Sequence, residues 1–342
     1  MTDASHASHA STATEIANTF TRQRSVPSPS LNLSVEEYRH PGTGALHLHL
    51  SSDSPENVFM VALRTVPEDS TGVAHILEHT ALCGSERYPV RDPFFMMLRR
   101  SLNTFMNAFT SSDWTAYPFA TQNRKDFGNL LDVYLDAVFF SRLDPLDFAQ
   151  EGHRVEFEND DRDQALTFKG VVFNEMKGAM SSTPSVLWDR LCFELFPSNT
   201  YHFNSGGDPE AIPDLTYQQL RDFYAEHYHP SNAIFLTFGD IPAADHQRIF
   251  ESAVLHRFDA LNRKVEVALE TAFTEPRSAT HTYAMDPEED IQNKTHLIMG
   301  WKLGESADLT AMLEAQLVAS VLMENSASPL MHYLETTTLG TA

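Results

Sequence analysis

The sequence predicts an α+β fold, in which strands and helices are mixed between about residue 31 and residue 240. Residues 45–50 alternate apolar and polar side chains, a pattern typical of a half-buried strand. Residues 126–140 carry apolar side chains at the spacing of an amphipathic helix. Residues 233–238 form a short apolar run that indicates a buried strand, and this strand closes the first unit.

The segment ahead of this unit differs in composition. Residues 1–30 are rich in Ser, Thr and Ala and contain no apolar core of the kind found in signal peptides. Their acidic and basic residues balance, which is untypical of an organellar presequence. We therefore expect residues 1–30 to form a flexible tail.

The most informative segment is the H-x-x-E-H pattern of His75, Glu78 and His79, which reverses the H-E-x-x-H motif of metalloproteases. On a helix, positions i and i+4 share a face, so the two imidazoles can bind one metal ion. Glu78 lies beside that face and can act as a general base. Two nitrogen ligands and an adjacent carboxylate form the core of a hydrolytic zinc site.

The surroundings of the motif favour this interpretation over an ordinary amphipathic helix with two hydrogen-bonded histidines. Residues 69–72 form a turn-type sequence with side chains suited to capping a helix. The apolar, strand-like residues 58–63 precede that turn. A helix docked beside a strand gives metal ligands a rigid support.

Other residues offer alternative metal ligands. Cys83 follows His79 by four residues and could supply a thiolate, although Gly84 is expected to end the helix there. His47 and His49 would point to the same face of their strand. That arrangement allows a two-histidine metal pair, and it equally fits a hydrogen-bonded strand face.

The end of the chain predicts a second unit. Residues 241–290 hold many charges, which suits a connection. Residues 296–301 indicate a further strand, and residues 308–324 a helix with Asp308 at its N-cap. A second helical stretch surrounds residues 330–334.

This second unit is short compared with the first. We expect a first domain over residues 31–262 and the incomplete beginning of a second domain over residues 263–342. The total length of 342 residues exceeds one average domain, in keeping with this division.

The charge of the chain excludes some partners. Apolar residues make up 42% and charged residues 21%, which is ordinary for a globular protein. The 24 basic and 47 acidic residues give a net charge of -23. Such a surface repels phosphates, so we expect neither nucleic acid nor a membrane as a partner. It could instead attract basic peptides.

The cysteine content bears on the compartment. The chain has two cysteines, Cys83 and Cys192, which is too few for a disulfide scaffold and indicates a reducing environment. No apolar run approaches the ~20 residues that span a bilayer. We expect a cytoplasmic location, with a mitochondrial or plastid matrix as the alternative.

A catalytic zinc ion takes three protein ligands and keeps one position open, so a third ligand is needed. Glu175 lies among apolar residues in segment 169–178 and is far enough from His79 to belong to another helix. By residue type alone this choice is open, because 47 acidic residues compete for the role.

The sequence resembles the pitrilysin and insulysin superfamily of inverted zinc proteases, and within it the presequence-protease branch. The resemblance extends from about residue 31 to the end of the chain. Besides the H-x-x-E-H motif, it rests on segments 69–72, 82–94, 101–110, 133–139, 170–178, 205–209 and 228–233. We interpret Gly206, Gly207 and Asp208, within one of these segments, as a structural turn.

The resemblance implies a fold and a metal site. The fold is a two-layer α/β sandwich domain of the mitochondrial-processing-peptidase-like type, followed by the start of a second related domain. Glu175 joins His75 and His79 as the third ligand of one Zn²⁺ ion per chain, and Glu78 is the catalytic base.

The resemblance also implies a substrate-binding edge. Asn107, Ala108 and Phe109 match a segment that is an edge strand beside the zinc ion in related proteins. They would bind the backbone of a peptide substrate by strand addition, which favours extended peptides over folded proteins.

The implied activity is that of a zinc-dependent endopeptidase, which hydrolyses extended, unfolded oligopeptides such as presequence-like peptides. Proteases of this type have two halves that close around a chamber, and the C-terminal half has no counterpart in these 342 residues. Another chain could supply that half. The alternative is a catalytically impaired fragment or a non-catalytic partner subunit that binds zinc or peptide.

Overall fold

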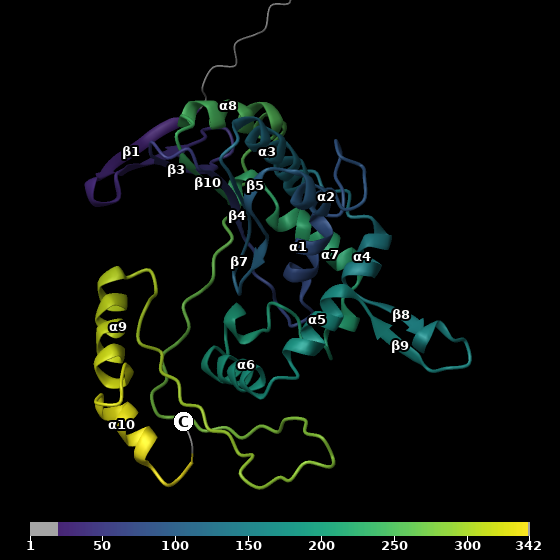
Figure 1. Cartoon of the computed structure of the whole chain (residues 1–342), viewed down its shortest axis with the longest axis vertical. Helices are drawn as coiled ribbons and strands as arrows, with labels where there is room; N and C mark the ends of the chain where they lie inside the picture. Colours follow the sequence, from purple (N-terminus) through teal and green to yellow (C-terminus); the bar gives the residue numbers. More distant parts are fainter. Residues whose placement is uncertain (1–19, 341–342) are drawn as a thin grey trace, which may run out of the picture.

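The computed structural model describes residues 20–340. Its main unit is built on a mixed β-sheet (Figure 1). Within these residues the sheet has eight strands in the order β1-β2-β3-β10-β4-β7-β5, and β6 also pairs with β7. The strands are β1 (Thr21–Ser28), β2 (Leu33–Arg39), β3 (Leu46–Ser51), β4 (Asn57–Arg64), β5 (Asn103–Met106), β6 (Phe109–Thr110), β7 (Trp114–Thr121) and β10 (Ala233–Gly239).

The last strand of the sheet in sequence lies at its centre in space. β10 runs parallel to β3 and antiparallel to β4. A strand with a neighbour on both sides has every backbone group paired and is rich in apolar residues, which is the composition of β10. The strands predicted over residues 45–50 and 233–238 are therefore confirmed as β3 and β10.

Two helices, α3 (Arg124–Phe139) and α8 (Ala243–Ala253), pack on one face of the sheet. Phe119 of β7 contacts Phe127 and Tyr134 of α3, with ring centroids 5.1 Å apart in each pair. Phe235 of β10 lies 4.7 Å from Phe250 of α8 between centroids. These aromatic contacts form much of the core between a sheet layer and a helix layer, so the predicted α+β sandwich is confirmed.

A second group of helices lies around the end of the sheet near β6 and β7. α1 (Val73–Ala81) contacts α4 (Pro145–Glu151), α7 (Tyr217–His227) and β6. The hairpin of β8 (Arg154–Phe157) and β9 (Leu166–Lys169) projects from the body and leads into α5 (Val171–Ala179), as Figure 1 shows. The remaining helices of this region are α2 (Pro93–Arg100) and α6 (Thr183–Leu195).

The flexible tail predicted for residues 1–30 is wrong from residue 21 onward, and residues 1–19 lie outside the described part of the chain. Strand β1 pairs antiparallel with β2 from Thr21↔Arg39 to Ser28↔Leu33. Its side chains are almost all exposed. The strand is held by its backbone ladder and buries little apolar surface, so the hydrophobic pattern does not reveal it.

The strand predicted over residues 296–301 is also wrong, because residues 259–308 contain no helix or strand. A strand needs a neighbour for its backbone groups, and no strand in the described range pairs with this segment. Leu297 and Trp301 are consequently exposed. The segment lies against α6, where Glu194 contacts His281 at 2.9 Å.

Two helices follow and confirm those predicted over residues 308–324 and around residues 330–334, whereas α8 occupies the start of the connection predicted over residues 241–290. They are α9 (Leu309–Met323) and α10 (Pro329–Thr336), drawn in yellow in Figure 1. Asp308 Oδ1 accepts hydrogen bonds from the backbone N–H groups of Thr310 and Ala311, both at 3.0 Å. The division into domains at residue 262 stays a prediction. Of the helices between residues 20 and 340, none is long and apolar enough to cross a membrane.

Candidate metal centre

Helix α1 begins at a position that requires glycine. Gly72 is its N-cap and has φ 72°, in the left-handed region. A Cβ atom at this position would lie 2.8 Å from Gly207 Cα and 2.9 Å from Gly206 O. The loop around Gly206 therefore packs directly on the start of the helix that carries the H-x-x-E-H motif.

His75, His79 and Glu175 come together, although α1 and α5 are distant in sequence. One potential ligand atom from each residue lies within 4.8 Å of the other two. His75 Nε2 is 3.9 Å from Glu175 Oε2, and the two imidazole rings are 5.0 Å apart between centroids. The Glu175 side chain is 54% exposed, so the centre is open to solvent on that side.

The two histidines are held by hydrogen bonds at their Nδ1 atoms. His75 Nδ1 lies 2.9 Å from the carbonyl oxygen of Gly206, and His79 Nδ1 lies 3.2 Å from Glu151 Oε2. Because a carbonyl and a carboxylate can only accept, each Nδ1 carries the proton and each Nε2 keeps its lone pair. The Nε2 atoms are thus available as metal ligands.

A close contact between two glycines brings the elements around the centre together. Gly152 ends α4 directly after Glu151, and Gly170 precedes α5. A Cβ atom at Gly170 would overlap the carbonyl oxygen of Gly152. The absence of a side chain here lets α4 and α5 approach each other, which places Glu151 and Glu175 around the same pair of histidines.

Glu78 lies beside the ligands in a buried position. Its Oε2 atom accepts a hydrogen bond of 2.6 Å from the hydroxyl of Thr110 on β6. Burial raises the pKa of Glu78 above its ordinary value, while the Thr110 hydrogen bond and the two nearby histidines oppose that shift. A carboxylate with a raised pKa beside a metal centre is suited to accepting and returning a proton.

His79 is surrounded by three carboxylates, those of Glu78, Glu151 and Glu175. Burial lowers its pKa, but the hydrogen bond that Nδ1–H donates to Glu151 and the charges of Glu78, Glu151 and Glu175 raise it, and the net shift is upward.

The predicted substrate-contact residues lie along the sheet edge next to this centre. Asn107 and Ala108 connect β5 to β6, and Phe109 begins β6. In the described chain, β5 and β6 have β7 as their sole strand neighbour. Phe109 is 41% exposed, and its ring stacks on that of Phe105 at 6.3 Å.

Cys83 is not placed as a ligand. Its buried sulfur donates a hydrogen bond to the carbonyl oxygen of His79 at 3.4 Å. Burial raises the pKa of the thiol far above its ordinary value, which opposes the thiolate that zinc binding requires. Across residues 20–340, the one group of three or more potential ligands at metal-binding separation is that of His75, His79 and Glu175.

His47 and His49 make hydrogen bonds inside the core. Both rings lie 2.8 Å from the hydroxyl of Thr237 on β10, and His47 Nδ1 accepts from Gln247 of α8 at 3.1 Å. His246 packs beside them, and neither of its ring nitrogens has a hydrogen-bond partner. The structure favours the hydrogen-bonded interpretation of these histidines over a metal pair.

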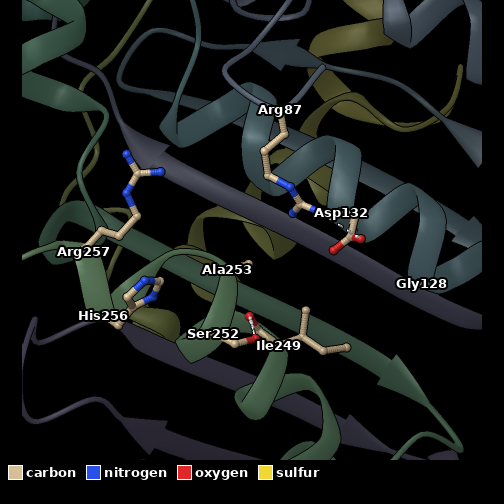
Figure 2. Close-up of a pocket in the computed structure, with 8 residues that line it drawn as sticks. All are labelled: Arg87, Gly128, Asp132, Ile249, Ser252, Ala253, His256 and Arg257. Carbon is tan, nitrogen blue, oxygen red and sulfur yellow. Dashed lines mark hydrogen bonds and ion pairs between the residues drawn. The ribbon is translucent and has the colours of Figure 1, made fainter. Parts of the chain in front are cut away.

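A cleft between α3 and α8 has no connection to the metal centre. It has a volume of about 620 Å³ and is lined by Arg87, Gly128, Asp132, Ile249, Ser252, Ala253, His256 and Arg257 (Figure 2). Arg87 pairs with Asp132 at 3.6 Å, and Arg257 pairs with Glu86 at 2.9 Å. Since both guanidinium groups already have acidic partners, we assign the cleft no role.

The donor set of the centre fits a zinc ion. Two imidazole nitrogens and one carboxylate oxygen are the ligands of many hydrolytic zinc sites. The orientation of both Nδ1 atoms away from the centre, and the exposure of Glu175, provide three converging donors and one open side.

Sequence reasoning missed Glu151, Thr110 and the contribution of Gly206. The turn predicted at residues 206–208 is present, since Asp208 N donates to Ser70 O at 2.8 Å, and it also supplies the carbonyl that orients His75. A backbone carbonyl leaves no signature in a sequence. Glu151 is one of 47 acidic residues, and nothing in its surroundings in the chain distinguishes it.

Comparison with known proteins agrees with this fold and motif. The insulinase (peptidase family M16) model matches residues 64–184, and the peptidase M16 inactive domain model matches residues 214–342. The mitochondrial presequence protease of Xenopus tropicalis is 47% identical over 328 residues, which are 94% of this chain and 32% of that protein. That of Danio rerio is 48% identical over 314 residues, 91% of this chain and 30% of that protein.

Solved structures show the same fold. Pitrilysin matches with a TM-score of 0.56 and 20% identity, over 74% of this chain and 26% of that chain. A protease from Helicobacter pylori matches with a TM-score of 0.54 and 20% identity, over 68% of this chain and 52% of that chain.

The sandwich fold and the H-x-x-E-H helix are those of peptidases whose metal-binding motif is inverted. The chain belongs to the insulinase family, peptidase family M16. Within that family, relatives that match more than nine-tenths of the chain include mitochondrial presequence proteases. The chain spans about a third of the length of these relatives, 32% in the Xenopus tropicalis protein.

Proposed function

We propose that this chain provides the catalytic part of a zinc-dependent endopeptidase that hydrolyses extended, unfolded oligopeptides. The observation that carries the proposal is the convergence of His75, His79 and Glu175, with the buried Glu78 carboxylate beside them. Membership of the insulinase family supports the assignment to peptidases.

One zinc ion per chain would be held by His75 Nε2, His79 Nε2 and a Glu175 oxygen. When bound, zinc makes a water molecule more acidic and polarises the carbonyl group of the peptide bond. The chain's own residues supply the orientation of the ligands, through the hydrogen bonds at both Nδ1 atoms.

Glu78 would act as the general base. Its carboxylate accepts the proton of the attacking water and then returns it to the nitrogen of the leaving amine. The Thr110 hydroxyl holds one carboxylate oxygen, which leaves the other oxygen for the proton transfer.

The edge formed by residues 107–110 would bind the substrate backbone. Asn107 N donates to Pro118 O and Ser111 N donates to Trp114 O, both on β7. Backbone groups of an antiparallel strand alternate in direction, so those of Ala108 and Thr110 point away from β7. An extended peptide could pair there as an added strand, next to Glu78, with Asn107, Ala108 and Phe109 as contact residues.

The names of the relatives bear on substrate and location. They are mitochondrial presequence proteases, which supports presequence-like peptides as substrates. They favour a mitochondrial matrix over the cytoplasmic location expected from the sequence. Immunofluorescence with a mitochondrial marker in the source cells tests the location.

The deciding experiment combines metal analysis with a cleavage assay. The purified chain should bind about one zinc ion, and it should cleave a quenched fluorescent presequence peptide unless a chelator is present. Zinc binding without cleavage would support the alternative of a non-catalytic or impaired subunit. Addition of a C-terminal polypeptide from a related protease then tests whether a partner restores cleavage. Absence of zinc binding would refute the proposal.

A further inference from the structure

Glu151 has a position that neither ligand binding nor proton transfer explains. It ends α4, its side chain is only 11% exposed, and its Oε2 atom lies 3.2 Å from His79 Nδ1. Its Oε1 atom accepts a hydrogen bond from Gln150 at 3.2 Å. Both carboxylate oxygens therefore have partners within the protein.

Glu151 lies on the side of His79 opposite to the ligand side. It contacts Nδ1, which leaves Nε2 as the ring nitrogen available to converge with His75 and Glu175. Glu151 does not belong to the group of residues at metal-binding separation. A role as a fourth ligand is excluded by this geometry.

We propose that Glu151 is a positioning residue, which fixes the ring orientation and tautomer of His79 and strengthens His79 as a metal ligand. This proposal rests on the proposed zinc site. The two histidines differ in the group that accepts the hydrogen bond of Nδ1, which is a neutral peptide carbonyl for His75 and a carboxylate for His79.

An imidazole in water has two tautomers of similar energy and a freely rotating ring. A carboxylate at Nδ1 binds only the Nδ1–H form, so the ring that remains presents its Nε2 lone pair. The negative charge also increases electron density on the imidazole, and such outer carboxylates typically change metal affinity tenfold to a hundredfold.

The local fold gives Glu151 a defined position. Asp144 caps the start of α4 by accepting a hydrogen bond from Leu146 N at 2.8 Å. Gly152, at the other end, lies in contact with Gly170. A side chain at the end of a short helix that is fixed at both ends has little freedom to leave His79.

The test compares two variants of nearly equal size. Glu151→Gln keeps an oxygen acceptor for Nδ1–H and loses the charge, whereas Glu151→Met loses both. Competition with a chromophoric chelator should give a zinc Kd about tenfold to a hundredfold weaker for Glu151→Met, and a smaller loss for Glu151→Gln. Asp147→Asn removes a charge from the same helix without touching His79, and it should change the Kd by less than about twofold.

A second measurement uses the unaltered, metal-free chain. Nitrogen-15 NMR of the histidine rings should show His79 as the Nδ1–H tautomer, and Glu151→Met should abolish this preference. An Nε2–H tautomer of His79 in the unaltered chain overturns the proposal, even if the Met variant does not fold.

Equal zinc affinities of the Met variant and the unaltered chain also overturn it. If the unaltered chain binds no zinc, the proposed function fails, and the tautomer of His79 still decides the role of Glu151.

Discussion

Glu78 is the residue on which the proposed chemistry depends most directly. Replacement of Glu78 by Gln keeps its size and its contact with Thr110 but removes the basic carboxylate. Peptide cleavage should fall by about a hundredfold to ten-thousandfold, because general base catalysis contributes that much. Zinc content, measured by elemental analysis, should stay unchanged.

Substitutions of the three proposed zinc ligands provide the comparison for Glu78→Gln. His75→Ala, His79→Ala and Glu175→Ala should each lose zinc as well as activity, because each removes a donor. A Glu78→Gln protein that still cleaves peptides at the original rate would remove Glu78 from the mechanism.

Gly72 contacts the loop at Gly206 and Gly207, so its substitution tests the importance of that contact. Gly72→Ala places a Cβ atom against Gly207 in a left-handed conformation, so it should lower the free energy of unfolding by about 1–3 kcal/mol. It should also weaken zinc binding, because it displaces the loop that holds His75. Denaturant unfolding and zinc titration measure the two effects.

Gly128 provides the control. It lies inside α3, and a Cβ atom there would have no neighbour within 4 Å. Gly128→Ala should therefore raise the free energy of unfolding by about 0.5–1 kcal/mol. Equal effects of the two substitutions would show that the contact at Gly72 is unimportant.

The sequence allowed the side chains of the motif to be predicted, because their spacing on a helix determines their common face. Glu175 could be chosen only through the resemblance, since its approach to His75 depends on tertiary structure. Gly206 and Glu151 could not be found, because their contacts with the histidines span 131 and 72 residues.

At the scale of elements, strand β6 links the sheet edge to the catalytic base through Thr110. Thr110→Val removes the hydroxyl at nearly constant volume and leaves Glu78 without that hydrogen bond. The rate constant kcat should fall by about tenfold to a hundredfold, as expected for a hydrogen bond to a charged group. KM and zinc content should change little.

Thr110→Ser retains the hydroxyl and should restore most of kcat. If the Val and Ser variants have the same kcat, the hydroxyl does not orient Glu78. Steady-state kinetics with one peptide substrate decides between these results.

The contact between β3 and α8 predicts a loss of stability in acid. Burial lowers the pKa of His47, His49 and His246, that of His246 to about 3. Glu36 opposes the shift of His49 without reversing it. In the unfolded chain these histidines titrate near pH 6.5, so below that pH the unfolded state binds more protons than the folded state.

These three histidines should therefore make the free energy of unfolding fall as the pH decreases below 6.5, by about 1.4 kcal/mol per pH unit for each histidine. His246→Phe should reduce the slope of the free energy of unfolding against pH by the contribution of one histidine. The Phe ring can replace that of His246, which packs among Phe127 and Phe250 without hydrogen bonds. Urea unfolding from pH 7 to pH 5 measures both slopes. An unchanged slope in the variant would contradict the assignment.

Elements with a clear apolar pattern were predictable, as β3, β10 and α3 illustrate. Strand β1 was not, because its ladder with β2 uses backbone groups and its side chains are exposed. Residues 296–301 have the composition of a strand but no neighbouring strand within the described part, so propensity alone misled the prediction.

At the scale of the whole molecule, the net charge of -23 predicts a preference for basic peptides. A negative surface increases the encounter rate with cationic substrates, and salt screens this attraction. At low ionic strength, kcat/KM should be higher for a basic peptide than for an acidic peptide of the same length. The difference should shrink in 0.5 M salt, about where the screening length falls to a few ångström. Equal values at low salt would remove this role of the surface charge.

The hydrogen bond between His75 and Gly206 connects residues 131 positions apart, and it has a consequence for folding. An unfolded chain cannot hold the two ends of this loop together, so it cannot offer the arranged ligands. Zinc would therefore bind the native state selectively and raise the melting temperature in proportion to the logarithm of its concentration. During refolding, the time at which zinc binding returns would measure when this long loop closes and the domain assembles.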